Sequence, residues 1–362
     1  MNKDYGYVSL PDMQYLLVGL AINVKRCADV LDGVLTAFNQ KMGIPDQILA
    51  WNVKGGNATG PLSFPDRGRF IVELTQSLQS GGQELWTAAL LEKHNEKEKA
   101  PVVFIRMHSP SLDIPMRLEI PLRALMKGGP LLEGTYCVYL HALLVDDGTE
   151  FVYYGITKRG WNLRFAEHTR AAVAEKSRRL FSRKLNELIE ARAAKIIGKI
   201  DGRPKLAAIV SSLPGVGLSK DSAMDIEEYL VEKYSLSSLH PRGLNMIPGG
   251  RAGIAALHLV SSKNPKNVVE TEEREVALDQ YLKNHPQVGV PNPGVSEKWN
   301  DSTYAEAVIC GRENGLGADQ VRRIRYLAAL GVTAEQIKED VGAIDEGQIQ
   351  RVIANRTYSR IK

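Results

Sequence analysis

Two apolar stretches separated by a tight turn constrain the fold of this chain more than any other feature. GTYCVYLHALLV (residues 134–145) and FVYYGI (151–156) both have the composition of β-strands, and Asp-Asp-Gly (146–148) lies between them. Because Asp-Gly readily adopts the positive φ angles of a tight turn, we expect the two stretches to pair as an antiparallel hairpin. An amphipathic helix is predicted to begin near Trp161, directly after the second strand.

The alternating pattern continues beyond this helix, so residues 131–260 are expected to form one α/β domain. KLAAIVSSL (205–213) has the composition of a third strand, and Ser219 can cap a helix that extends to about Tyr234. LPGVGLS (213–219) is expected to be the loop that joins this strand to this helix. The predicted fold class is mixed α/β, with a small three-stranded sheet flanked by helices.

Residues 1–130 are expected to form an N-terminal α/β domain whose function the sequence does not indicate. Helical periodicity runs through residues 1–95, as in the apolar set Phe70, Ile71, Leu74 and Leu78. A buried strand, PVVFIRM, is predicted to follow at residues 101–107. No group of side chains in this third of the sequence has the pattern of a reactive site.

The C-terminal part is predicted to hold a connector and a helical DNA-binding module. Residues 261–315 contain several prolines and should form a connector with one short helix at about 272–282. Residues 316–362 have the pattern of a helix-turn-helix. One apolar helical face, a helix-ending glycine and two capping boxes carry this interpretation: Val321, Ile324 and Leu327; Gly331; Thr333 with Gln336, and Asp345 with Gln348.

Composition is typical of a globular protein inside the cell. Apolar residues make up 44% of the chain and charged residues 24%. Cys27, Cys137 and Cys310 are far apart, which favours a reducing compartment. The first residues lack the pattern of a secretory signal, and the longest apolar run is shorter than the about 20 residues that span a bilayer. We therefore expect a cytoplasmic protein with no membrane partner.

Positive charge is concentrated between Gly155 and Lys205. This segment has 14 Lys or Arg residues and 5 Asp or Glu residues, an excess of nine positive charges, whereas the whole chain carries +4. A phosphate backbone attracts such a concentration, although a solvated helix would have the same composition. The predicted DNA contacts in this segment are Lys158, Arg159, Arg178, Arg179 and Arg183.

The hairpin and the helix after it are expected to bring polar groups together. Arg164 and His168 are four residues apart, so they share one face of the helix. Tyr136 and Tyr153 lie on the two paired strands and can reach the same region. A phosphate would satisfy this cluster, because arginine donates bidentate, charge-assisted hydrogen bonds to phosphate oxygens.

These residues, in this order, resemble the GIY-YIG nuclease family over about 130 positions, roughly a third of the chain. The matches are GTY (134–136) with Tyr136, YYG (153–155) with Tyr153, Arg164, His168, Glu227 in EEYLVEKY (227–234) and Asn245 in PRGLNMIPGG (241–250). Three departures stand beside them. The first signature has Thr in place of Ile, the gap between the two tyrosines is long, and Ile156 stands where some members have lysine.

The resemblance implies a DNA endonuclease that hydrolyses phosphodiester bonds with one divalent cation. Glu227 would hold Mg²⁺ or Mn²⁺, and Arg164 would bind the scissile phosphate. A water would be deprotonated by Tyr136 or Tyr153, with His168 as a relay, while Asn245 would belong to the same catalytic set. A tyrosine can act as this base when neighbouring positive charge favours its phenolate.

The expected partner is double-stranded DNA. The C-terminal module resembles the helix-turn-helix modules of invertases and phage proteins, which implies that a helix at about 345–354 enters the major groove with Gln348, Gln350 and Arg351 as readers. A site-specific restriction or homing enzyme is the favoured interpretation. A structure-selective repair or recombination nuclease and a catalytically inactive DNA-binding regulator remain alternatives, and a homo-oligomer is compatible with each.

Overall fold

The computed structural model describes ten stretches of the chain. These are residues 4–53, 69–79, 83–93, 100–109, 113–196, 204–260, 274–284, 302–310, 315–359 and 361. They belong to two units, Met1–Val290 and Pro291–Lys362, each of which has its own interior. Among the described residues, no helix is both long and apolar enough to cross a membrane.

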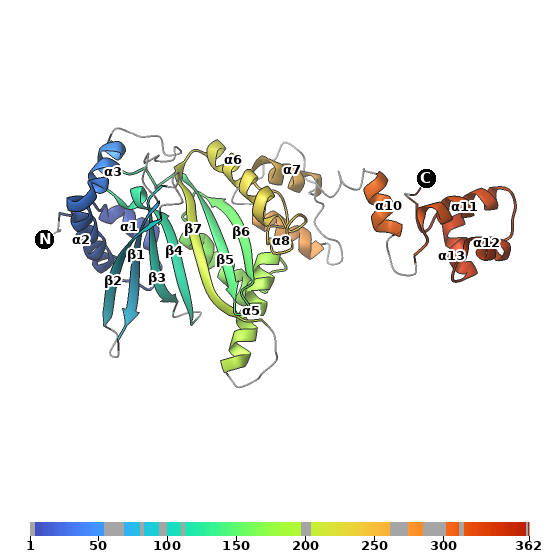
Figure 1. Ribbon diagram of the computed structural model, residues 1–362, viewed down its shortest axis with the longest axis horizontal. Helices are drawn as coiled ribbons and strands as arrows, with labels where there is room; N and C mark the ends of the chain where they lie inside the picture. The colour runs from blue at the N-terminus through green and yellow to red at the C-terminus, as the bar shows by residue number, and fades with distance from the viewer. Residues whose placement is uncertain are drawn as a thin grey trace. The chain divides into compact units, whose positions relative to one another are not determined.

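A mixed seven-stranded sheet forms the centre of the first unit (Figure 1). In spatial order its strands are β2 (Glu84–Lys93), β1 (Arg69–Leu78), β3 (Val102–Ser109), β4 (Ile114–Pro121), β7 (Leu206–Leu218), β5 (Tyr136–Val145) and β6 (Glu150–Thr157). The α/β class is confirmed, but the predicted three-stranded sheet is too small. The reason is the parallel pairing of β4 with β7, which joins the N-terminal strands to the predicted domain and covers an edge that would otherwise be unpaired.

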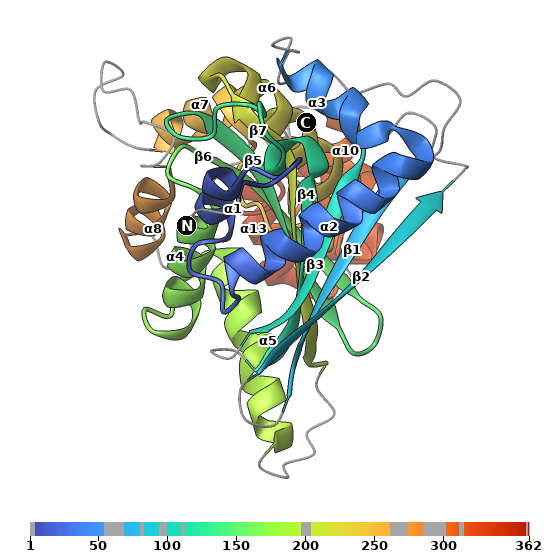
Figure 2. The same ribbon diagram turned by 90° about the vertical axis from the view of Figure 1, so that its left-hand side faces the viewer.

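Helices cover both faces of this sheet. On one face lie α1 (Leu10–Leu17), α2 (Val24–Met42), α3 (Ile44–Val53), α4 (Trp161–Val173) and α5 (Leu180–Ile196). Figure 2 shows α2 crossing the sheet on the viewer's side. On the other face α6 (Lys220–Leu230) packs against β5, β6 and β7 and continues into a π-helical turn, Val231–Ser235. Next to α6 lies α7 (Gly250–Val260), followed by α8 (Arg274–Asn284).

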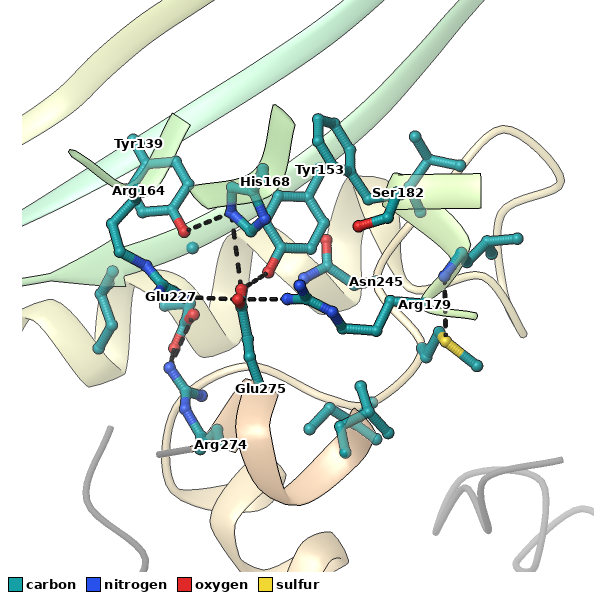
Figure 3. A pocket seen from close by; sticks show the side chains of 18 of the residues that line it. Tyr139, Tyr153, Arg164, His168, Arg179, Ser182, Glu227, Asn245, Arg274 and Glu275 are labelled. Carbon is teal, nitrogen blue, oxygen red and sulfur yellow. Dashed lines mark hydrogen bonds and ion pairs between the residues drawn. The ribbon is translucent and has the colours of Figure 1, made fainter. Parts of the chain in front are cut away.

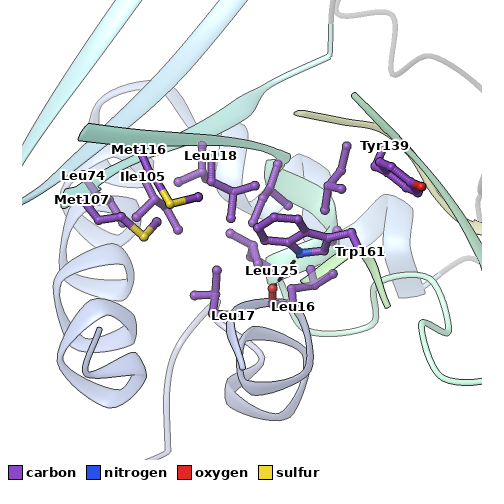
Figure 4. Close-up of a cluster of buried hydrophobic side chains, with 14 of the residues drawn as sticks. Leu16, Leu17, Leu74, Ile105, Met107, Met116, Leu118, Leu125, Tyr139 and Trp161 are labelled. Atoms are coloured by element: carbon purple, nitrogen blue, oxygen red, sulfur yellow. Dashed lines mark hydrogen bonds between the residues drawn. The ribbon is translucent and has the colours of Figure 1, made fainter. Parts of the chain in front are cut away.

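One hydrophobic core lies beneath strands from both sides of residue 130 (Figure 4). Trp161 at the start of α4 is 1% exposed, and its indole N–H donates a hydrogen bond of 2.8 Å to the carbonyl of Leu16 in α1. Leu74 and Ile105 belong to the same buried cluster. The predicted N-terminal domain and the predicted nuclease domain therefore share one sheet and one interior.

The prediction of helix for residues 70–78 is wrong, because these residues form strand β1. Phe70, Val72 and Leu74 alternate toward α2, where the Phe70 ring lies 5.5 Å from that of Phe38. Strand β1 pairs with β2 on one side and β3 on the other. The apolar spacing at positions 70, 71, 74 and 78 is also compatible with a helix. Pairing with strands that are distant in the sequence decides that these residues form a strand.

The hairpin and the helix starts near the predicted site are confirmed. Strands β5 and β6 pair antiparallel around Gly148, whose φ is 83°. The Ser219 hydroxyl accepts a hydrogen bond from the Ser222 amide and caps α6, and the connector contains its short helix as α8. LPGVGLS was expected to be a loop, but β7 extends to Leu218, with a register shift opposite Val138. The prolines of the connector lie outside the described residues.

The second unit contains the predicted helices in the predicted order. They are α11 (Ala318–Ala329), α12 (Ala334–Val341) and α13 (Glu346–Ile353). Before them lies α10 (Ser302–Cys310), a helix that was not predicted and that falls within the predicted connector. The three apolar positions expected to share a face of α11 are buried. Gly331 has a φ of 80° just after that helix, Thr333 and Gln336 form a capping box, and the Asp345 carboxylate caps α13.

Candidate active site

A pocket opens beside β6 where side chains from five elements meet (Figure 3). Besides those five elements, β5, β6, α4, α6 and α8, the polar lining includes residues of α5 and of the segments just before α5 and α7: Tyr139, Tyr153, Arg164, His168, Arg179, Ser182, Glu227, Asn245, Arg274 and Glu275. Five of the six residues predicted to be catalytic therefore line one pocket. The sixth, Tyr136, does not.

Tyr139, rather than Tyr136, stands next to Tyr153. In the hairpin His141 pairs with Tyr153 and Tyr139 pairs with Gly155, so the odd-numbered positions of β5 share the face of Tyr153. Tyr136 lies on the opposite face, in an apolar cluster with α6. The two tyrosines of the pocket are therefore closer together in the sequence than Tyr136 and Tyr153, the pair on which the family resemblance was based.

Glycine at position 155 allows Tyr139 to lie against the backbone of β6. A Cβ at this position would stand 2.4 Å from the Tyr139 hydroxyl oxygen, which is too close for any other residue. The second signature, YYG, therefore contributes Tyr153 to the pocket, and its Gly155 leaves the space that the Tyr139 ring occupies.

Helix α4 positions Arg164 and His168 toward the two tyrosines. Trp161 and Phe165 belong to the main hydrophobic core and pack this helix against the sheet. The Tyr139 hydroxyl lies 3.2 Å from His168 Nε2. Burial lowers the pKa of His168 to about 4, which favours the neutral imidazole at pH 7. Burial also raises the pKa of Tyr139, and Arg164 opposes that rise.

Glu227 is a buried carboxylate at the other end of the pocket. Its side chain is 4% exposed, and its Oε2 accepts a hydrogen bond of 2.8 Å from the Gly250 amide. Arg274 Nη2 contacts both oxygens, at 3.0 Å and 2.8 Å. Asn245 links this end of the pocket to the edge of β6. Its side-chain nitrogen donates to the Tyr154 carbonyl, and its side-chain oxygen accepts from the Tyr154 amide.

Glu275 lies at the centre of the cationic end. Its carboxylate forms ion pairs with Arg164, at 2.7 Å, and with Arg179, and it accepts a hydrogen bond of 2.9 Å from the Tyr153 hydroxyl. Burial alone would raise the pKa of Glu275, but His168, Arg179 and Arg164 together lower it below its usual range. The ion pairs with Arg164 and Arg179 and the hydrogen bond from Tyr153 favour the ionised form of this carboxylate.

The donor set around Glu227 fits Mg²⁺ as an ion that keeps most of its water. Mg²⁺ is commonly held by one or two carboxylates and substrate phosphates, with water in the other positions. Glu227 offers one buried carboxylate, and its present partner is itself a cation. Among the described residues, no group of three or more His, Cys, Asp or Glu side chains could enclose a metal ion.

The other predicted DNA contacts fall into three places. Arg179 lies in the pocket, 11% exposed. Lys158, Arg178 and Arg183 are exposed around it, and Arg159 pairs with Glu167. In the second unit Gln350 and Arg351 are exposed on α13, while the Gln348 side chain accepts a hydrogen bond from the Ile344 amide.

Sequence reasoning missed Tyr139, Arg274 and Glu275, and it placed Arg179 among surface contacts. The register set by the Asp-Gly turn could have found Tyr139, because it puts odd-numbered residues of the first strand opposite Tyr153. Arg274 and Glu275 had no local signal, since their partners lie 47 and more residues away in the chain. Only the packing of α8 against the pocket shows them.

We compared the chain with protein families, curated proteins and solved structures. No family model matches this chain, and neither the curated proteins nor the solved structures give a significant match. The resemblance to the GIY-YIG family therefore rests on the ordered residues of the sequence alone.

Proposed function

We propose that the chain is a DNA endonuclease that uses one divalent cation. The observation that supports this most is the meeting of two tyrosines, an arginine, a histidine and a glutamate in one pocket: Tyr139, Tyr153, Arg164, His168 and Glu227. These residues come from two strands and two helices, so local composition alone does not account for their meeting. Each has a chemical role in the hydrolysis of a phosphodiester.

Arg164 and Arg179 are suited to bind the scissile phosphate. Both point at one anion, the Glu275 carboxylate, and arginine has the planar donor geometry that phosphate oxygens accept. Tyr153 would add a third hydrogen bond to that anion. We assign phosphate binding to these three residues.

Tyr139 and His168 are suited to move a proton. Their side chains are in hydrogen-bond contact. The Tyr139 hydroxyl can pass its own proton to the neutral imidazole of His168 as the phenol oxygen takes a proton from the attacking water. This assigns the general base to Tyr139 in place of Tyr136, with His168 as the relay. Mg²⁺ or Mn²⁺ at Glu227 would stabilise negative charge on the leaving oxygen.

Double-stranded DNA is the proposed substrate. Exposed cations lie on α4 and α5 and between them, the part of the chain that also contributes Arg164, His168 and Arg179 to the pocket. The second unit contains short helices in the order expected for a helix-turn-helix module. A site-specific enzyme of the restriction or homing type remains our favoured interpretation, because a separate module would supply sequence readout. A cytoplasmic location stays a prediction from the cysteine pattern.

One observation favours a second function, that of a DNA-binding regulator without nuclease activity. Arg274 pairs with Glu227 and Glu275 pairs with Arg164, so both charged ends of the pocket are already satisfied within the chain. If this pairing were permanent, neither a cation nor a phosphate could enter. The pocket would then be a structural remnant.

One experiment separates these functions. The full chain is incubated with supercoiled plasmid, linear duplex and branched DNA, each with Mg²⁺, Mn²⁺ or EDTA. A site-specific nuclease gives discrete metal-dependent fragments from linear DNA, and a structure-selective nuclease cuts only the branched substrate. Binding without any cleavage, in either metal and on every substrate, would establish the regulator and refute our proposal.

A further inference from the structure

Helix α8 inserts two adjacent residues of opposite charge into the pocket. Arg274 and Glu275 stand in its first turn, and their side chains are 9% and 16% exposed. Figure 3 shows Arg274 in contact with Glu227 and, beside it, Glu275 in contact with the two arginines. Every charged group assigned to the proposed reaction thus has a partner from a single helical turn.

Arg274 takes the position that the proposed function gives to a metal ion. Its guanidinium contacts both oxygens of Glu227, the residue that would hold the cation. Two cations this close to one carboxylate repel each other strongly in a buried site. Arg274 and a divalent cation therefore compete for Glu227.

Glu275 takes the position that the proposed function gives to the scissile phosphate. Its carboxylate accepts from Arg164, Arg179 and Tyr153, the three donors assigned to phosphate binding. Its negative charge also contributes, after burial, to a raised pKa of Tyr153, so the phenol is held protonated. An oxygen of DNA cannot reach these donors while the carboxylate occupies them.

Helix α8 also makes polar and apolar contacts with its neighbours. Asp279 accepts hydrogen bonds from Ser177 at 2.7 Å and pairs with Arg179 at 3.1 Å. Arg178 donates to the Leu282 carbonyl at 3.0 Å. Leu278 and Leu282 pack on Leu257 in a small apolar cluster. Contacts of this kind can be exchanged for those of DNA, because phosphates supply the same charges to the same arginines.

We propose that α8 is an autoinhibitory element, an internal ligand whose Arg274 stands in for the divalent cation and whose Glu275 stands in for a DNA phosphate. This inference rests on the proposed function for the identity of the two ligands. Because the two residues are adjacent on one helix, they leave together. Cation and DNA binding are consequently coupled, and each ligand raises the affinity for the other.

The first test measures Mn²⁺ binding to the full chain by calorimetry, without DNA. Arg274→Gln should tighten Mn²⁺ binding about tenfold or more, since the fraction of open pocket rises and the competing cation is gone. Lys283→Gln is the matched control, because it removes a positive charge from an exposed position on the same helix and should change nothing. In the double variant that combines Glu227→Gln with Arg274→Gln, the increase in Mn²⁺ affinity should be lost.

The second test locks α8 in place and does not depend on a destabilised variant. Ser177→Cys combined with Asp279→Cys replaces two side chains in contact with a disulfide under oxidising conditions. The oxidised chain should lose most Mn²⁺ affinity and most affinity for a short DNA duplex, and dithiothreitol should restore both. Ser177→Cys alone, oxidised and reduced, is the control.

The outcomes separate this inference from the nuclease proposal. Unchanged Mn²⁺ affinity in a folded Arg274→Gln chain, or equal affinities of the oxidised and reduced double-cysteine chain, would overturn autoinhibition. If the affinities shift as expected but no variant cuts DNA, autoinhibition stands and the nuclease proposal fails. If the oxidised chain cuts DNA as fast as the reduced chain, the nuclease stands and autoinhibition fails.

Discussion

At the scale of single residues, the pocket depends on which face of a strand each tyrosine occupies. Tyr139 and Tyr136 differ by three positions, so strand alternation sends them to opposite faces of the sheet. Tyr139 contacts His168 within the pocket, whereas Tyr136 packs against α6. For this reason our proposal gives the proton-transfer role to Tyr139.

The two tyrosines can be tested with the same substitution. Tyr139→Phe removes the hydroxyl that contacts His168 and should lower the rate of DNA cleavage by about 10²- to 10⁴-fold, the usual worth of general base catalysis. Tyr136→Phe removes a hydroxyl outside the pocket and should leave the rate within about twofold. Single-turnover cleavage in Mg²⁺ measures both, and the reverse ranking would restore Tyr136 as the base.

Glu227→Gln keeps the size of the side chain and removes its charge. Mn²⁺ affinity should fall, and cleavage should drop by about 10²-fold or more, since charge stabilisation at the leaving oxygen is lost. DNA binding should survive or tighten, because Arg164 and Arg179 remain and α8 loses its tie to Glu227.

Neighbouring acids on α6 provide controls for this variant. Glu228 accepts a hydrogen bond from the Ala252 amide, and Asp225 pairs with Arg251, both away from the pocket lining. Glu228→Gln and Asp225→Asn should therefore keep cleavage close to the level of the unchanged chain. Loss of cleavage in Glu228→Gln with full activity in Glu227→Gln, both shown to be folded by circular dichroism, would move the metal site to Glu228.

At the scale of elements, the sequence correctly predicted those helices and strands whose ends are set by nearby turn and capping residues. The hairpin of β5 and β6, the start of α4 and the cap of α6 follow from turn and capping residues, and each is where the sequence indicated. Strand β1 was taken for helix because its identity depends on β2 and β3 rather than on its own spacing. The docking of α8 was equally out of reach, since its partners are distant in the chain.

The basic surface beside the pocket gives a prediction for α4 and α5. Lys158 and Arg183 are exposed near the pocket, and replacing both with Gln should lower the slope of log affinity against log salt by about two units, one for each lost phosphate contact. Lys25 and Lys41, exposed on α2, form a matched pair whose replacement should leave the slope unchanged. Equal slopes for both pairs would show that the surface near the pocket does not meet the DNA backbone.

At the scale of the whole molecule, the continuity of the sheet decides which pieces can fold. Strand β7 lies between β4 and β5, so a cut near residue 130 would expose the edge of β7 and remove Leu16 from the Trp161 indole. The sequence indicated an α/β class here but divided it at residue 130, because alternation and turns say nothing of which strands become neighbours. The break between the two units at Pro291 falls instead within the predicted connector.

Two truncations test this division and the role of the second unit together. Residues 1–290 keep the sheet, the pocket and α8, so they should fold cooperatively, cut DNA weakly in Mg²⁺, and bind it with lower affinity and blurred site choice. Residues 131–290 lack the strands that cover β7 and should show no cooperative thermal unfolding by circular dichroism. If residues 1–290 cut the same sites with the affinity of the full chain, the second unit has a role other than DNA recognition. Cooperative unfolding of residues 131–290 would mean that the predicted three-stranded domain is independent after all.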